Sequence, residues 1–425
     1  MVKNFVRKFT PEKLVGWYHF TLAGLAAVWY GFPSRKLHVI GITGTKGKST
    51  VSEMVNSILE ADGRRTTLVS TIRFKVNEDD RPNRLKMTMP GRFFLQKTLA
   101  QAVKQKSTHA ILEMTSEGAK LWRHRFIDLD ALVFTNLTPE HIESHGSFEN
   151  YKKAKLAIAR RLVDSKKTDT LLVTNDDDPA SEDFLAIGPP RSAEFALEQA
   201  KPYTVTEDHC QFSWQGEDLT LPLGGSFNLL NALAAATLAR ELDIPPQTIK
   251  KGLENVTKIP GRFEYVKTAT THRQPMTVVV DYAHTPESLT EIYKTFNTYH
   301  RVCVLGNTGG GRDKWKRPVM GKIANEHCDQ IFLTNEDPYD ENPRTIVSAM
   351  AEAITDTPYE IILDRRKAIR KALEKASHYP EKPAVVLITG KGTDPYIMEK
   401  NGRKTPWNDA KVTQEELDDL LTRSS

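Results

Sequence analysis

The stretch "GITGTKGKST", residues 41–50, ends like a phosphate-binding loop but does not begin like one. Gly47, Lys48 and Ser49 match the end of the pattern G-x-x-x-x-G-K-[ST], whereas Ile42 stands where that pattern has its first glycine. The loop is shorter and consists of Gly44, Thr45, Lys46, Gly47, Lys48 and Ser49. It is either a degraded motif or the working variant of a different family.

The sequence on both sides of the loop predicts a strand, a turn and a helix. "KLHVIGIT", residues 36–43, is typical of a buried strand, and residues 48–63 form an amphipathic run that ends at a glycine. Backbone N–H groups at a helix N-terminus hold phosphate oxygens. We therefore predict a nucleotide site in which Lys48 neutralises phosphate charge and Ser49 or Thr50 binds Mg²⁺. The alternative is a glycine-rich turn without a ligand.

The composition predicts a soluble chain of more than one domain. Its 425 residues exceed one ordinary domain, and 39% of them are hydrophobic, enough for true cores. The 59 basic residues nearly balance the 54 acidic ones, and no basic stripe carries interleaved aromatics, so we expect no nucleic-acid partner. Cys210, Cys303 and Cys328 form no C-x-x-C pair, which favours a reducing cytoplasm over a disulfide framework.

Short apolar runs alternate with amphipathic stretches from residue 37 onward, which predicts an α/β fold. The alternation pauses near "TKIPGRFEYV", residues 257–266, and then resumes. We expect a P-loop ATPase domain with a mostly parallel sheet over residues 37–260. A Rossmann-like α/β domain is expected over residues 261–425, ending in a short acidic helix from residue 415.

The first 36 residues are apolar and basic. The run at residues 20–32 is too short to span a bilayer, and no small-residue cleavage site for a signal peptide follows it. We expect a helix packed on the first domain. The alternative is a helix at the inner membrane surface, because Trp17, Tyr18, Trp29 and Tyr30 flank the run.

Further polar residues follow predicted strands of the first domain. Glu113, in "LEMTSEG", ends one strand at the edge of the sheet where ligands of parallel sheets bind. His141, His145 and Lys155 lie in residues 135–159. Each histidine alone is more typical of a loop or a core than of a metal site, since Mg²⁺ prefers oxygen ligands.

Eight motifs together resemble the Mur ligase family, whose members join amino acids to cell-wall precursor peptides. In order they are GTKGKST, EMTSEG, HIESHGSFENYKKAK, NLLNALAA, PGRFE, DYAHTPESL, GGGRDKWKRP and GKGTDPY. They span residues 37 to about 400, and DYAHTPESL and RDKWKRP look most like the enzyme that adds the diamino acid. The family uses the short loop, so the resemblance implies a working variant. It also implies ATP, two Mg²⁺ ions, an acyl-phosphate intermediate and small-molecule or peptide substrates.

The resemblance assigns roles to single residues. Lys48, Ser49, Glu113, His141 and a carbamylated Lys155 would hold the phosphates and the metal ions. Asn231, Arg262, Asp281 and His284 would contact the nucleotide. The substrates would be held by Thr88, Met89, Pro90, Ser116, Arg312, Asp337 and Asp394.

Three features depart from the family pattern. Only about 36 residues precede the first predicted strand, too few for the family's uridine-binding domain. The family sequence D-N-P-R is replaced by Glu336-Asp337-Pro338-Tyr339, and "ENPR", residues 341–344, lies too far along, in the start of a helix. The loop at residues 305–314 is about one residue longer than usual. The amino acid added therefore stays open, as does the oligomeric state.

Two other functions compete with this reading. One is a folylpolyglutamate-synthase-like or poly-glutamate ligase, which also lacks the uridine-binding domain; the motifs DYAHTP and RDKWKRP argue against it. The other is a non-catalytic nucleotide-binding scaffold. Intact Lys48, Glu113, His141 and Lys155 argue against that, because a scaffold needs no carbamate site.

Overall fold

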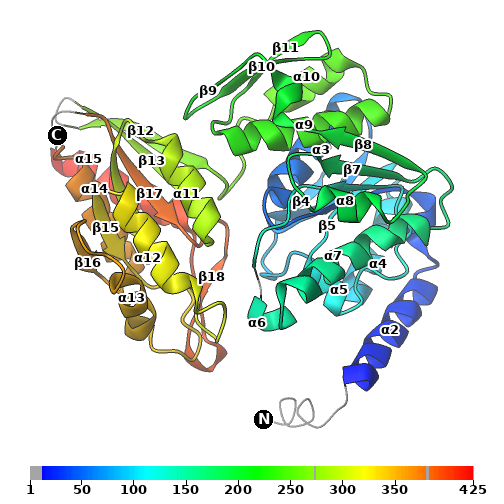
Figure 1. Cartoon of the computed structure of the whole chain (residues 1–425), viewed down its shortest axis with the longest axis horizontal. Coiled ribbons are helices and arrows are strands. Elements are labelled where there is room, and N and C mark those ends of the chain that lie inside the picture. The colour runs from blue at the N-terminus through cyan, green and yellow to red at the C-terminus, as the bar shows by residue number, and fades with distance from the viewer. Residues whose placement is uncertain (1–11, 141, 272–273, 380–381, 425) are drawn as a thin grey trace.

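The computed structural model describes residues 12–140, 142–271, 274–379 and 382–424. Two α/β units lie side by side, one built on an eight-stranded sheet and the other on a six-stranded sheet (Figure 1). Both sheets are mostly parallel, as the alternation of strands and helices predicted.

The eight strands of the first sheet follow the order β4-β3-β2-β5-β1-β6-β7-β8. The strands β2, β5, β1, β6, β7 and β8 pair in parallel, each with the next. At the edge of the sheet, β3 pairs antiparallel with β2, and β4 pairs antiparallel with β3. The strands are β1 (His38–Thr43), β2 (Thr66–Val69), β3 (Arg73–Val76), β4 (Asp79–Pro82), β5 (His109–Glu113), β6 (Ala131–Phe134), β7 (Leu171–Asn175) and β8 (Arg191–Phe195).

Helices cover both faces of this sheet and create two cores. One core joins α3 and α9 to the sheet, and α9 is buried almost all round because its sequence is mostly alanine and leucine. The other core joins α4 and α7 to the opposite face. The helices are α3 (Lys48–Ala61), α4 (Arg92–Lys104), α5 (Ser116–Lys120), α6 (Ile142–His145), α7 (Phe148–Val163), α8 (Ser181–Leu185), α9 (Ser226–Glu241) and α10 (Pro246–Glu254).

A small antiparallel sheet, which the sequence did not predict, packs beside α10. It consists of β9 (Tyr203–Val205), β10 (Cys210–Trp214) and β11 (Glu217–Leu221). Its apolar residues alternate and join the core around α9, so the sheet lies outside the parallel layer.

The second unit has strand order β12-β13-β17-β14-β15-β16, in which only β12 is antiparallel to its neighbour. Its strands are β12 (Glu264–Thr271), β13 (Gln274–Asp281), β14 (His300–Leu305), β15 (Gln330–Leu333), β16 (Tyr359–Ile361) and β17 (Ala384–Thr389), with a hairpin of β18 (Tyr396–Met398) and β19 (Lys404–Pro406). Its helices are α11 (Pro286–Thr295), α12 (Lys316–His327), α13 (Pro343–Ala351), α14 (Arg365–Ala376) and α15 (Asp409–Ser424).

Two expectations for this unit were wrong. The last helix begins at Asp409, six residues before the acidic run, because Val412 and Leu417 pack into the core. Cys303 and Cys328 form a disulfide with a Cα–Cα distance of 6.2 Å, although no disulfide was expected. Cys303 lies on β14 and Cys328 just before the adjacent parallel strand β15, so the topology brings together two cysteines that are distant in sequence.

The apolar N-terminal run forms helix α2 (Glu12–Trp29), followed by a short 3₁₀ helix η1 (Pro33–Lys36). The inner side of α2 buries Ala23, Ala26 and Ala27, and Phe20 contacts the rings of Trp122 and Phe126. The predicted packing on the first unit is therefore confirmed. The first 11 residues lie outside the described part of the chain.

Candidate active site between the two units

The loop between β1 and α3 has the backbone that the short glycine motif predicts. Gly44 has φ +147° and Gly47 has φ +79°, conformations that side chains rarely adopt. A Cβ atom at Gly44 would lie 1.9 Å from Thr135 Oγ1, and one at Gly47 would lie 2.2 Å from Asn231 Oδ1. Both positions therefore favour glycine, and Asn231, on α9, lies directly against the loop.

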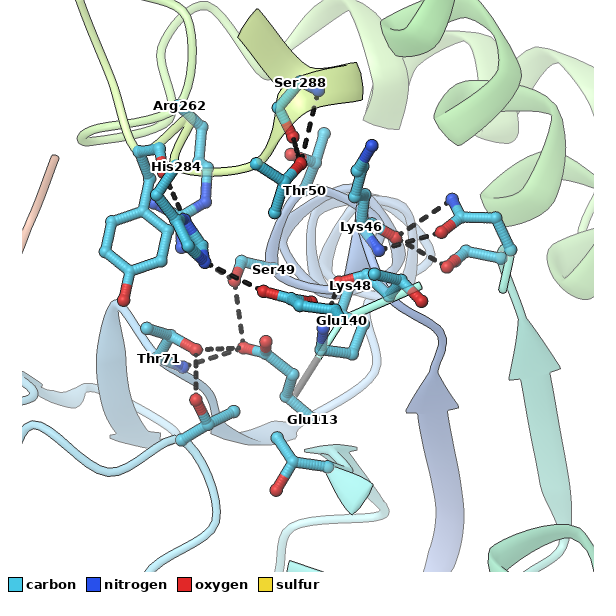
Figure 2. A pocket seen from close by; sticks show the side chains of 18 of the residues that line it. Lys46, Lys48, Ser49, Thr50, Thr71, Glu113, Glu140, Arg262, His284 and Ser288 are labelled. Carbon is cyan, nitrogen blue, oxygen red and sulfur yellow. Dashed lines mark hydrogen bonds and ion pairs between the residues drawn. The ribbon is translucent and has the colours of Figure 1, made fainter. Parts of the chain in front are cut away.

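Oxygen ligands meet the N-terminus of α3 in one cluster (Figure 2). Ser49 Oγ donates to Glu113 Oε2 over 3.0 Å, and the same carboxylate oxygen accepts from the backbone N–H and the hydroxyl of Thr71 at 2.8 and 2.9 Å. Lys48 Nζ donates to the carbonyl of Thr45 at 2.8 Å. Burial lowers the pKa of Lys48, against the attraction of Glu113. Sequence analysis had not identified Thr71.

Side chains of the second unit reach this cluster, among them Arg262 and His284 (Figure 2). Arg262 Nη2 lies 3.4 Å from Ser49 Oγ and its guanidinium lies over the ring of Tyr282. His284 Nε2 lies 3.0 Å from Glu140 Oε1. Glu140 was also missed, although it directly precedes the motif HIESHGSFENYKKAK.

A cavity of about 480 Å³ joins these residues. Most predicted nucleotide residues line it: Thr45, Lys46, Gly47, Lys48, Ser49, Thr50, Asn231, Arg262, Asp281 and His284. The carboxylate of Asp281 already accepts hydrogen bonds from the backbone N–H groups of Phe263 and Ala283, each at 2.6 Å. Of the predicted site residues that the structure describes, Gly44, Pro90 and Lys155 line neither this cavity nor the neighbouring one.

Lys155 lies behind the loop rather than in the open cavity. Its side chain is buried on α7, and Nζ donates to the carbonyl of Gly44 at 2.5 Å. Burial, with the charge of Lys48 nearby, holds the pKa of Lys155 well below its ordinary value. A buried amine of this kind is neutral more readily than an exposed one.

The donors near Lys48 suit Mg²⁺. This ion binds proteins through one or two carboxylates and keeps water or phosphate oxygens in its other positions. Glu113 and Ser49 Oγ supply such oxygens at the helix N-terminus. Within the described ranges, no group of three or more His, Cys, Asp and Glu side chains forms a metal site. His141, the other predicted ligand, lies outside those ranges.

A second cavity, of about 300 Å³, adjoins the first and is rich in carboxylates. Lys86, from the first unit, forms ion pairs with Asp337 and, at 3.0 Å, with Asp394 of the second. The buried Lys391 ammonium lies 2.8 Å from Asp337. Burial opposes ionisation of Asp337, but the Lys391 and Lys86 ammonium groups outweigh it and lower its pKa. Buried Glu336 also faces this cavity, and its Oε2 has no hydrogen-bond partner among the described residues.

The basic side chains that line this second cavity are Lys86, His284, Arg312, Lys316 and Lys404. Arg312 lines both cavities and lies over the ring of Tyr339, 5.2 Å from its centroid. Arg344, in the displaced "ENPR", is exposed in the first turn of α13, as expected.

The predicted acceptor residues lie where the two cavities meet. Thr88 lines both, and its hydroxyl lies 2.7 Å from that of Thr71. Met89 and Ser116 line the first cavity, whereas Pro90 is buried beside it.

Comparison with known proteins agrees with this geometry. Residues 42–239 match the Mur ligase middle domain, and residues 261–392 match the Mur ligase, glutamate ligase domain. The UDP-N-acetylmuramoyl-L-alanyl-D-glutamate–2,6-diaminopimelate ligase of Halalkalibacterium halodurans is 35% identical over 94% of this chain and 82% of its own.

Two solved structures are also similar. One is described as a UDP-N-acetylmuramoyl-L-alanyl-D-glutamate–2,6-diaminopimelate ligase; it has a TM-score of 0.59 at 26% identity and covers 91% of this chain and 79% of that one. The folylpolyglutamate synthase of Mycobacterium tuberculosis has a TM-score of 0.71 at 18% identity and covers 95% of each chain, a likeness that shows the fold alone. With its two domain matches and this identity over nearly its whole length, the chain belongs to the Mur ligase family of ATP-dependent, amide-forming ligases.

Proposed function

We propose that the protein adds an amino acid to a peptidoglycan-precursor peptide through an acyl phosphate. One observation carries the proposal: Lys48 and Ser49 of the first unit and Arg262 and His284 of the second line one cavity. We assign residues 37–260 to ATP binding and residues 261–425 to the incoming amino acid, with residues 1–36 as a separate segment. The two domain matches, at 42–239 and 261–392, support this division.

The residues of the loop would act on the phosphates. Backbone N–H groups at the start of α3 hold phosphate oxygens, and Lys48 neutralises charge during transfer to the acceptor carboxylate. Asn231 fixes the loop from the opposite side, and Arg262 and His284 close over the nucleotide. The closed cavity then excludes water, which would otherwise hydrolyse the acyl phosphate.

Ser49 and Glu113 would hold Mg²⁺, which when bound neutralises phosphate charge. We assign a second ion to His141 and to a carbamate on Lys155. Formation of a carbamate needs a neutral amine, and the burial of Lys155 favours that form. Its present bond to the Gly44 carbonyl places it beside the phosphate loop.

We further propose that the added amino acid carries a side-chain ammonium, as lysine does. The ammonium of Lys86 already lies between Asp337 and Asp394, so this pair of carboxylates accepts such a group. Arg312 would hold the α-carboxylate, because its planar fork suits a carboxylate. Tyr339 stands where the family pattern D-N-P-R has its arginine, so the second carboxylate of diaminopimelate would lack that partner.

We place the reaction in the cytoplasm, where ATP is available, and at the inner membrane surface through contact by residues 1–36. The acceptor would be a muramyl peptide held at residues 88–90, with its carboxylate facing the loop.

The test is ATP turnover with a panel of amino acids and acceptors. We expect product with lysine and a muramyl dipeptide acceptor, and much less with meso-diaminopimelate. Turnover with folate and glutamate alone would favour the folylpolyglutamate-synthase-like reading. Absence of turnover with every pair, in protein that binds ADP, would favour the scaffold.

A further inference from the structure

Helix α2 leaves a broad apolar face uncovered. Trp17, Tyr18, Leu25, Val28 and Trp29 have 72%, 59%, 60%, 65% and 79% of their surface exposed. At 100° per residue they fall within an arc of about 120°, opposite the side that packs on the first unit. We call these five residues the α2 stripe. Figure 1 shows α2 at the margin of the molecule, where its outer side faces away from both sheets.

No charged group interrupts the α2 stripe. Residues 14–34 contain no Asp, Glu, Lys or Arg. The hydroxyl of Thr21, which lies within the arc, donates to the carbonyls of Trp17 and Tyr18, each at 3.0 Å. A surface helix of a soluble protein is ordinarily polar on its outer side, and a contiguous exposed apolar patch marks an interaction site.

The charge of the N-terminal segment indicates the chemistry of the partner. Residues 1–36 hold six basic residues and one acidic residue, a balance of +5. This equals the net charge of the whole chain, so the other 389 residues carry 53 basic and 53 acidic groups. An exposed Arg35 and Lys36 follow the helix, and Lys13 lies in its first turn. The complement of an exposed apolar face on a basic segment is an anionic lipid surface.

The ring positions fit the same partner. Trp17 and Tyr18 lie towards one end of the helix and Trp29 at the other, and such rings are enriched at the level of lipid headgroups. In the described part of the chain, no helix is long and apolar enough to cross a bilayer. The inner side of α2 packs on the first unit, so only its outer side can contact lipid. The helix axis must therefore lie parallel to the membrane plane.

We propose that the α2 stripe binds the surface of an anionic phospholipid membrane, with α2 lying in the interface. The inference rests on the proposed location of the enzyme and names the face and the lipid class. It also has a consequence for the acceptor. His19 Nδ1 of α2 lies 2.9 Å from Arg92, which follows the predicted acceptor residues 88–90. Because this contact lies on the packed side of α2, the helix itself separates the acceptor loop from a membrane bound to the α2 stripe.

The experiment is flotation of the full-length protein with vesicles of phosphatidylglycerol mixed with phosphatidylcholine, and with phosphatidylcholine alone. The test variant is Leu25→Glu combined with Val28→Glu, since both side chains are exposed and contribute little to the core. The matched control is Tyr359→Glu, which places a charge at an exposed apolar site of the second unit. Light scattering without lipid and ATP turnover with a soluble acceptor are measured on each protein.

We expect the wild type and Tyr359→Glu to float with anionic vesicles and to detach at high salt. The double variant should show at least about a tenfold lower bound fraction, with unchanged turnover. Wild type that stays soluble with anionic vesicles overturns the proposal, as does equal binding by the double variant. A wild-type dimer that the double variant disrupts, without vesicle binding, assigns the stripe to a second copy instead. Loss of turnover in all proteins, with vesicle binding intact, contradicts the ligase assignment alone.

Discussion

Replacing Gly47 by alanine tests whether the glycine loop is built for a nucleotide. Gly47 has φ +79°, and an added Cβ would lie 2.2 Å from the Asn231 side chain. The loop must therefore either hold alanine in a left-handed conformation and displace Asn231, or move. Gly63 is the matched control, because its φ is +71° and its Cβ would meet no atom within 4 Å.

The expected loss of nucleotide affinity follows from the left-handed backbone conformation of Gly47. A left-handed alanine costs about 1–2 kcal/mol, so Gly63→Ala should lose that much unfolding free energy. At Gly47 the loop can relax this strain when it is empty. Binding of the phosphates then requires the original loop geometry and restores the strain. A cost of about 1–2 kcal/mol corresponds to roughly 5- to 30-fold weaker nucleotide binding.

The assay is calorimetric titration with ADP, together with denaturant unfolding of the same samples. Gly47→Ala should bind ADP roughly 5- to 30-fold more weakly, whereas Gly63→Ala should bind it as the wild type does. Equal weakening in both variants would mean that stability, not loop geometry, controls binding. Wild-type affinity in Gly47→Ala would refute the nucleotide loop itself.

Three other residues carry predictions. Lys155→Ala should abolish turnover, and excess bicarbonate should not restore it; Lys155→Arg keeps the charge and should also be inactive. The wild type, but neither variant, should show a carbamate signal after addition of ¹³C-bicarbonate, and near-native activity of either variant contradicts the assignment. Lys86→Met removes the ammonium that occupies the Asp337 carboxylate and should lower the KM for lysine several-fold, whereas Lys404→Met, in the same cavity, should not; an unchanged KM would mean that Lys86 does not compete. Burial, with nearby arginines, lowers the pKa of His124 to about 3, so between pH 6.5 and 3 the unfolded chain binds a proton that the folded one does not. The unfolding free energy should therefore decrease by roughly 1.4 kcal/mol, from this residue, for each unit by which the pH is lowered below 6.5. Urea titrations at pH 6.5 and 5 should show a smaller dependence of the unfolding free energy on pH in His124→Asn.

Local patterns were enough to predict most of the regular fold. Buried parallel strands are continuous apolar runs, and this made β1, β5, β6 and β17 visible in the sequence. The strands that were missed carry a different signal. β4 (Asp79–Pro82) is polar and wholly exposed. β9 has three residues and is mostly exposed, so neither strand forms an apolar run.

The site was predictable where a motif carries it and not where the fold creates it. Lys48, Ser49 and Glu113 were found because glycine spacing and strand ends are local features. Glu140 lines the cavity and lies 3.0 Å from His284, which is 144 residues away in the sequence. Likewise, the pairing of Lys86 with Asp337 and Asp394 depends on how the two units meet, and no spacing in the sequence records that.

Transfer of labelled oxygen tests the central claim most directly. The acceptor carboxylate is labelled with ¹⁸O, and the released phosphate is analysed by mass spectrometry after turnover with ATP and lysine. An acyl-phosphate route passes one labelled oxygen into each phosphate, because the acyl–oxygen bond breaks when the amine attacks. We predict phosphate that carries one ¹⁸O in wild-type turnover and no labelled phosphate with Lys48→Ala. Unlabelled phosphate accompanying amide formation by the wild type would contradict the account.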